Sequence, residues 1–117
     1  MATQFEKLME IVETVGMSEL NDFLAYDMNG IQRMLAGGTP ITEINNPFLS
    51  FVGEMELLDS YGGEGDGDRY WKVFRLGGHT YQLDAYYTSW DGTDFDSAEI
   101  YEVEPREVVK IEYSRKK

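Results

Sequence analysis

Apolar residues recur at helical spacing along the first part of the chain. Between Thr3 and Val15 they lie three or four positions apart, at Phe5, Leu8, Met9, Val12 and Val15. This spacing places them on one face of an α-helix. Thr3 followed by Glu6 predicts a capping box at the start of the helix, and Gly16 predicts its end.

A second helical pattern follows, with Ser18 as its predicted N-cap. Its apolar positions are Leu20, Phe23, Leu24, Met28, Ile31 and Leu35. Gly37, Gly38 and Pro40 predict where it ends. The chain therefore opens with two amphipathic helices, within about residues 3–37.

From about residue 50 the hydrophobic period changes to two, and β-branched and aromatic residues become frequent. We predict strands over residues 51–58, 69–76, 79–87, 100–103 and 107–113. Gly77 and Gly78 predict a two-residue type I′ hairpin between the second and third of these. The predicted fold class is α+β: two N-terminal amphipathic helices packed on an antiparallel sheet of four to five strands, the sheet occupying about residues 50–114.

Length and composition agree with a single domain over residues 1–117, because this length and a hydrophobic fraction of 42% suffice for one core. The chain has no cysteine, which excludes disulfides, thiolate metal sites and a cysteine nucleophile. The N-terminus lacks the pattern of a signal peptide, and no apolar run approaches the roughly 18 residues of a membrane span. We therefore expect a cytoplasmic protein with no membrane partner.

Charge is the most unusual property of the sequence. The formal net charge is −12, and residues 54–104 alone carry 13 acids against 3 bases. A field of this sign repels nucleic acid and anionic membranes and attracts basic surfaces. The expected partner is therefore a basic protein surface, with no direct nucleic-acid binding.

Two clusters of carboxylates could hold a cation. Glu64, Asp66 and Asp68 alternate with glycine in "GGEGDGD", as at the start of a calcium loop. An EF-hand requires glycine at its sixth position and glutamate at its twelfth, where this chain has Arg69 and Arg75. We predict a flexible acidic hairpin loop here, with no metal and no cofactor.

The second cluster comprises Asp91, Asp94, Asp96 and Glu99, and it matches no metal-binding motif. A weak divalent site remains an alternative at this position. An acidic loop tip is the commoner arrangement, and we predict that these carboxylates add to a negative surface.

The third predicted strand has two different faces. Tyr81, Leu83, Ala85 and Tyr87 form its apolar set, which leaves Thr80, Gln82, Asp84, Tyr86, Thr88 and Trp90 on the other face. Exposed Tyr and Trp anchor protein interfaces, and nearby carboxylates pair with Arg and Lys of a partner. The alternative is that Tyr86 and Trp90 pack beneath a loop.

An enzymatic role has little support in the sequence. Asp84 near Tyr86 and Trp90 would suit a carbohydrate site worked by paired carboxylates. The sequence offers no nucleophile elbow, phosphate loop or zinc-binding helix, and the single histidine, His79, borders a hairpin turn. We predict a protein without catalytic residues.

Same-face residues of a strand recur at roughly 6.6 Å, close to two axial steps of a DNA strand at roughly 3.4 Å each. Glu54 with Glu56, and Glu102 with Glu104, could therefore imitate a row of phosphates. The alternative is that the acids serve only solubility.

The second half of the chain resembles a family of small tailed-phage proteins. The resemblance covers about residues 60–113 and rests on Gly63–Gly67, Val73–Phe74, Tyr81, the "YYTSWDGT" stretch from Tyr86 to Thr93, and "EVEP" at Glu102–Pro105 through Val109. Ala85 stands where that family has glycine. The resemblance implies a phage origin and no particular activity.

Together, the charge and the resemblance lead to one hypothesis: an acidic phage accessory protein that binds and inhibits a basic, nucleic-acid-handling host protein of restriction or CRISPR type, as a partial nucleic-acid mimic. The predicted partner-binding residues are Glu64, Asp66, Asp68, Asp84, Tyr86, Trp90, Asp91, Asp94 and Asp96. One alternative is an interaction or assembly module that uses its aromatic or helical face, for instance to form a homodimer. Another is a carboxylate enzyme. A third is a protein that sequesters a small nucleotide through Arg69, Lys72, Arg75 or the basic C-terminal residues.

Overall fold

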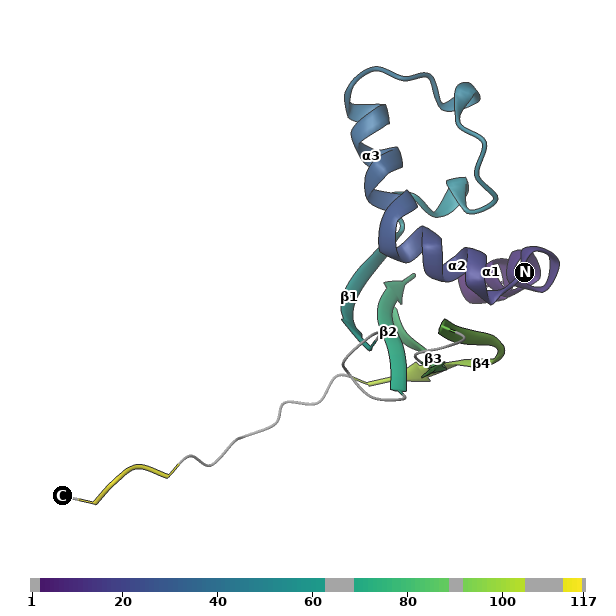
Figure 1. Ribbon diagram of the computed structural model, residues 1–117. Coiled ribbons are helices and arrows are strands. Elements are labelled where there is room, and N and C mark those ends of the chain that lie inside the picture. Colours follow the sequence, from purple (N-terminus) through teal and green to yellow (C-terminus); the bar gives the residue numbers. More distant parts are fainter. Residues whose placement is uncertain (1–2, 63–68, 89–91, 105–112, 117) are drawn as a thin grey trace.

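The computed structural model describes residues 3–62, 69–88, 92–104 and 113–116 (Figure 1). Its helical elements are α1 (Gln4–Val15), α2 (Met17–Asp22), a π-helical segment (Phe23–Asp27), α3 (Met28–Ala36) and two short 3₁₀ turns (Ile41–Glu43 and Leu49–Phe51). The strands β1 (Met55–Tyr61), β2 (Arg69–Leu76), β3 (His79–Thr88) and β4 (Gly92–Val103) form an antiparallel sheet in the order β1-β2-β3-β4. The predicted α+β class is confirmed.

The helices begin and end largely for the predicted reasons. The backbone N–H of Glu6 donates to Oγ1 of Thr3 over 3.1 Å, which caps α1. Ser18 does not cap the second helix, contrary to our prediction. Gly16, at a φ of +101°, lies between α1 and α2, and its conformation lets α2 begin at Met17 without a side-chain cap.

The second predicted helix runs continuously from Met17 to Ala36 but is not α-helical throughout. The turn Phe23–Asp27 is π-helical, which inserts an extra residue into the helix. Phe23 and Leu24 are buried in this turn, whereas Tyr26 is exposed.

Two strands begin at residues other than those predicted, and β1 and β3 end later than predicted, at Tyr61 and Thr88. The first strand begins at Met55, not at residue 51, because Phe51 ends a 3₁₀ turn and Gly53 turns the chain at a φ of +90°. The fourth strand begins at Gly92, not at residue 100. Pairing with the long strand β3 holds this acidic segment in extended form, although strand propensity alone disfavours Asp and Gly.

Of the predicted fifth strand, residues 107–113, only Tyr113 is described. It lies outside any strand and is 93% exposed. The Gly77–Gly78 hairpin is confirmed, because both glycines have positive φ values, +61° and +83°.

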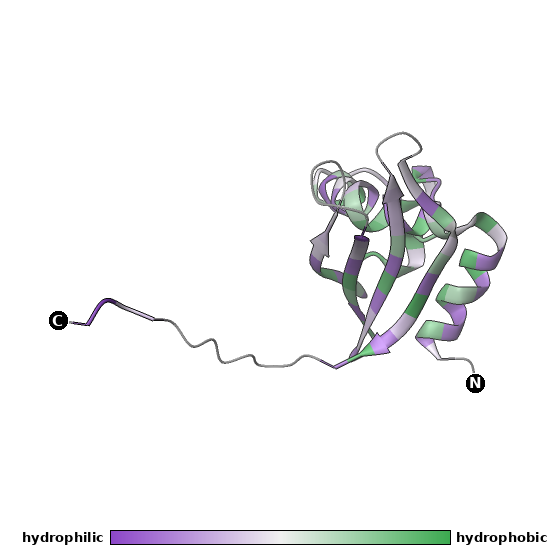
Figure 2. Ribbon diagram, turned by 60° about the horizontal axis from the view of Figure 1, so that its bottom comes forward, coloured by the Kyte–Doolittle hydropathy of each residue, from purple (hydrophilic) through white to green (hydrophobic). Residues whose placement is uncertain are grey.

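The helical segment covers one face of the sheet, called here the inner face (Figure 1). Contacts run from α2 on β4 to the π-helical turn on β1. Figure 2 shows hydrophobic and hydrophilic residues alternating along α1, as an amphipathic helix requires. The fully buried side chains that join the two layers are Leu8, Leu20, Phe23, Leu24, Phe48, Phe74, Leu76 and Leu83.

The predicted alternation along β3 is confirmed. Tyr81, Leu83 and Ala85 are buried on the inner face, and Tyr86 is 62% exposed on the opposite side, called here the outer face. No helix within the described ranges has both the length and the apolar character needed to cross a membrane.

A matched pair of glycine variants tests this backbone. A Cβ on Gly62 would lie 2.4 Å from the carbonyl oxygen of Arg69, whereas a Cβ on Gly78 would meet nothing within 4 Å. Both glycines have positive φ. Gly78→Ala should therefore lower the free energy of unfolding by about 1 kcal/mol, and Gly62→Ala by about 3 kcal/mol, because a backbone clash is added to the strain. Urea denaturation measures both values, and equal losses would contradict the described approach of β1 to β2.

Candidate functional site

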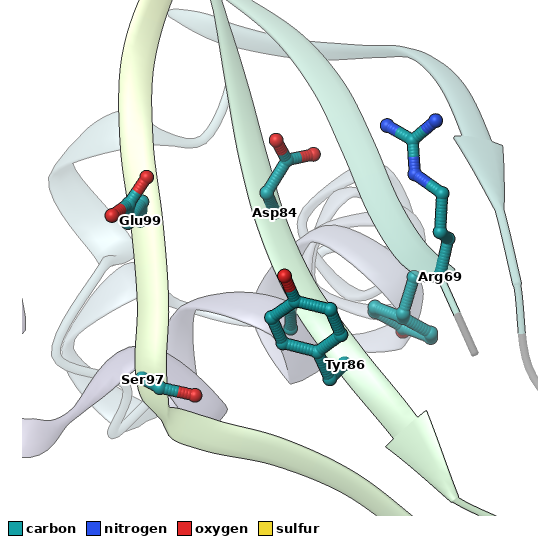
Figure 3. Close-up of a pocket in the computed structure, with 7 residues that line it drawn as sticks. Arg69, Asp84, Tyr86, Ser97 and Glu99 are labelled. Carbon is teal, nitrogen blue, oxygen red and sulfur yellow. The ribbon is translucent and has the colours of Figure 1, made fainter.

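Strand pairing gathers polar side chains into a small hollow on the outer face. Arg69 pairs with Tyr86 across β2 and β3, and Asp84 pairs with Glu99 across β3 and β4. The hollow, called here the outer hollow, has a volume of about 200 Å³ and is lined by Arg69, Tyr70, Asp84, Ala85, Tyr86, Ser97 and Glu99. Figure 3 shows Asp84 and Tyr86 on the central strand, with Glu99 to one side and Arg69 to the other.

Two donors hold the carboxylate of Asp84. Gln82 Nε2 donates to Oδ1 over 2.7 Å, and the Tyr101 hydroxyl donates to Oδ2. These bonds leave the charge of Asp84 without a cation, since ion pairs in the described ranges join only Arg75 to Glu56 and His79 to Glu102. The carboxylate is therefore oriented but not neutralised.

The bond to Asp84 also changes the acidity of Tyr101. This bond, with burial and the negative charge of Asp84, raises the pKa of Tyr101 to about 12. Ionising the phenol would remove the donated hydrogen bond and place two negative charges together. Tyr101 therefore remains a donor at neutral pH and fixes the position of Asp84.

Two further aromatic rings stack at the edge of the sheet, outside the lining of the outer hollow. Tyr61 of β1 stacks on Trp71 of β2, with ring centroids 5.6 Å apart and planes 15° apart. Tyr61, Tyr86 and Tyr101 are all exposed. The outer face thus combines exposed aromatic rings with carboxylates, as its sequence predicted for β3.

The described residues include only part of the predicted binding set. Asp84 and Tyr86 lie together in the outer hollow. Asp94 pairs with Tyr86 across β3 and β4, and its Oδ2 accepts a hydrogen bond from Ser97 Oγ over 2.9 Å. Asp96 belongs to β4, so it is not in an acidic loop tip. Glu64, Asp66, Asp68, Trp90 and Asp91 lie outside the described residues.

The predicted phosphate-like rows do not form. Glu54 precedes β1 in a turn, and Glu56 is paired with Arg75. Glu102 lies 3.1 Å from His79, and Glu104 follows the end of β4. The strand boundaries therefore place neither pair along one strand face, and two of the four carboxylates already face a basic side chain.

Sequence reasoning missed Arg69, Glu99 and Tyr101 as neighbours of Asp84. For Glu99, the error followed from the late predicted start of the fourth strand, which left this residue in a loop. A hairpin in which β4 matches the length of β3 would have placed Glu99 and Tyr101 beside Asp84 and Gln82.

Among the described residues, no three His, Cys, Asp or Glu side chains converge to hold a metal ion. Both predicted acidic clusters include residues beyond those ranges, so this observation does not test them.

No family model matches the chain, and no curated protein or solved structure is significantly similar to it. The resemblance to tailed-phage proteins therefore stays a prediction, and the functional argument rests on the geometry of the chain itself.

The Tyr101–Asp84 bond predicts a dependence of stability on pH. Because the pKa of Tyr101 is raised above the value of 10 for an unperturbed tyrosine, the folded state holds this proton more tightly than the unfolded state. The contribution of this hydrogen bond to the free energy of unfolding is complete below about pH 10 and is lost as the pH rises towards about 12. Urea denaturation at several pH values should therefore show a steeper alkaline loss for the native chain than for Tyr101→Phe. Parallel losses would contradict the assigned bond.

Proposed function

We propose that the chain is a non-enzymatic protein-binding module whose outer hollow receives an Arg or Lys side chain from a basic partner surface. The observation that carries this proposal is the pair Asp84 and Glu99, which face each other across β3 and β4 beside the exposed ring of Tyr86. A guanidinium between them would gain charge-assisted hydrogen bonds, and the tyrosine ring offers a cation–π contact.

The size and charge of the outer hollow support a side chain as its occupant. Its 200 Å³ is smaller than the roughly 300–1,000 Å³ of typical small-molecule sites. Arg69 supplies one positive charge against the two carboxylates, so a second cation would neutralise the group. The net charge of −12 adds a long-range attraction for a basic surface.

Within this class, we propose that the partner is a nucleic-acid-handling protein of the host cell, of restriction or CRISPR type, and that binding inhibits it by partial nucleic-acid mimicry in the cytoplasm of an infected cell. Support comes from the 13 acids within residues 54–104 and from the resemblance to tailed-phage proteins. The surfaces of such proteins that bind phosphates are basic, so one negatively charged face can occupy them.

A pull-down from bacterial lysate with a matched control tests the outer hollow. The test variant combines Asp84→Asn, Glu99→Gln and Tyr86→Ala. The control combines Glu10→Gln, Glu13→Gln and Tyr113→Ala, which make the same change in charge and in tyrosine content at exposed positions elsewhere. We expect the native chain and the control to retain a common partner and the test variant to bind it at least about tenfold more weakly, as measured afterwards with the purified partner.

Two further measurements test the proposed mimicry. Duplex DNA should compete with the chain for the partner, and affinity should fall steeply as salt increases. A variant with Glu64, Asp66, Asp68, Asp91, Asp94 and Asp96 changed to Asn or Gln should lose affinity as well. Salt-insensitive binding without competition by DNA would contradict mimicry while leaving a protein-binding role intact.

The stacked pair Tyr61–Trp71 favours one alternative, self-association through the outer face. Light scattering of the native chain distinguishes it. A dimer that Trp71→Ala converts to a monomer would assign the aromatic rings to a homodimer interface.

A further inference from the structure

A buried lysine lies on the inner face of the sheet, among hydrophobic residues. Lys72 is only 7% exposed and precedes the buried Phe74 on the same face of β2. Its Nζ donates to the Tyr70 hydroxyl oxygen over 2.5 Å and lies 4.4 Å from the centroid of that ring. The Tyr70 hydroxyl in turn donates to Asn21 Oδ1 over 2.9 Å. A polar chain therefore runs from β2 to α2.

The ammonium group of Lys72 has no counterion in the described part of the chain, where no carboxylate lies within 4.0 Å of it. An ammonium carries three donors, and one of them is used by Tyr70. A buried charge without an opposite charge is unfavourable, because desolvation is not offset by attraction. This arrangement is more unusual still in a chain with 22 acids and 10 bases.

Lys72 lines an open cavity on the inner face, beside the π-helical turn. The cavity has a volume of about 560 Å³ and is lined by Tyr26, Ser60, Tyr61, Gly62, Tyr70, Lys72, Tyr87 and Thr93. This volume lies in the range of small-molecule sites. Its tyrosine-rich lining combines apolar rings with hydroxyl groups, which suits a planar ligand with one polar end.

The local backbone supports a binding role for this cavity. Tyr26 belongs to the π-helical turn and is 72% exposed, so it borders the cavity without contributing to the core. Isolated π-helical turns occur often at functional sites. Ser60 pairs with Lys72 across β1 and β2, and Thr93 pairs with Tyr87 across β3 and β4, which places hydroxyl groups on the same face as the ammonium.

We propose that this cavity binds a small planar ligand carrying a single negative charge, a carboxylate or a phosphodiester, with Lys72 as the counterion. The ammonium would donate to the anionic oxygens, and the tyrosine rings would contact the planar body. A single charge is specified because one lysine neutralises one charge, and the net charge of −12 repels polyanions. Tyr70 lines both this cavity and the outer hollow, but Lys72 and Asp84 lie on opposite faces of the sheet, so either proposal can fail alone.

Nuclear magnetic resonance titration of the full chain tests the proposal. The probes are benzoate and methyl phenyl phosphate, each with one negative charge, and benzamide, which is similar in shape to benzoate but neutral. At least one of the two anions should shift the resonances of Lys72, Tyr87 and Thr93, and benzamide should not. The stronger anion identifies carboxylate or phosphodiester as the preferred group. If neither anion shifts these resonances, or if benzamide shifts them equally, the proposal is wrong.

Two variants and a matched control test whether the Lys72 ammonium and the Tyr26 ring bind the anion. Lys72→Met keeps the aliphatic stem and removes the ammonium, and it should weaken binding of the preferred anion at least about tenfold. Lys7→Met makes the same change in net charge at an exposed position of α1 and should leave binding unchanged. Tyr26→Ala removes an exposed ring that borders the cavity, so it should weaken binding severalfold without affecting folding. Equal binding by Lys72→Met and the native chain would overturn the proposal.

Stability of the ligand-free protein separates a binding lysine from a structural one. If the ammonium serves a ligand, Lys72→Met should leave the denaturation midpoint unchanged or raise it, because a buried charge with no counterion in the described ranges is removed. A clear fall in the midpoint would show that the ammonium stabilises the fold through Tyr70 and Asn21, and it would count against the ligand site.

Discussion

Burial of the inner face of the sheet beneath the helical segment is the constraint on which the other features depend. Phe74 and Leu83 are fully buried against helical side chains such as Leu20 and Phe23. Because successive side chains of a strand point to opposite faces, this packing also determines the composition of the outer face. A shift of one residue would move Asp84 into the core and Leu83 into solvent, so the hydrophobic contacts fix the outer hollow as firmly as they fix the core.

Strand β2 supplies one cation to each face of the sheet, and the two cations lie in different environments. Arg69 lies in the outer hollow near carboxylates and the exposed ring of Tyr86, whereas the Lys72 ammonium lies over the Tyr70 ring on the inner face. The two proposals accordingly assign a cationic side chain to the outer hollow and an anion to the inner cavity.

Local signals predicted much of the fold but missed its irregular parts. The Thr3 cap and the Gly77–Gly78 turn were predicted correctly because each depends on a few neighbouring residues. The π-helical turn was missed, since the helical spacing of its apolar residues resembles that of an ordinary helix. The start of β4 was placed too late because Asp94 and Asp96 have low strand propensity, which pairing with β3 overrides.

The sequence by itself determined the α+β class, the alternation along β3 and the strong negative charge. These features depend on periodicity and composition, which are local or additive properties of the chain. Only the tertiary structure decided that Glu99 lies opposite Asp84, that Tyr101 holds that carboxylate, and that Lys72 is buried with no counterion among the described residues. These facts depend on the pairing of distant strands and on how the helices pack on the sheet, and no local pattern encodes either.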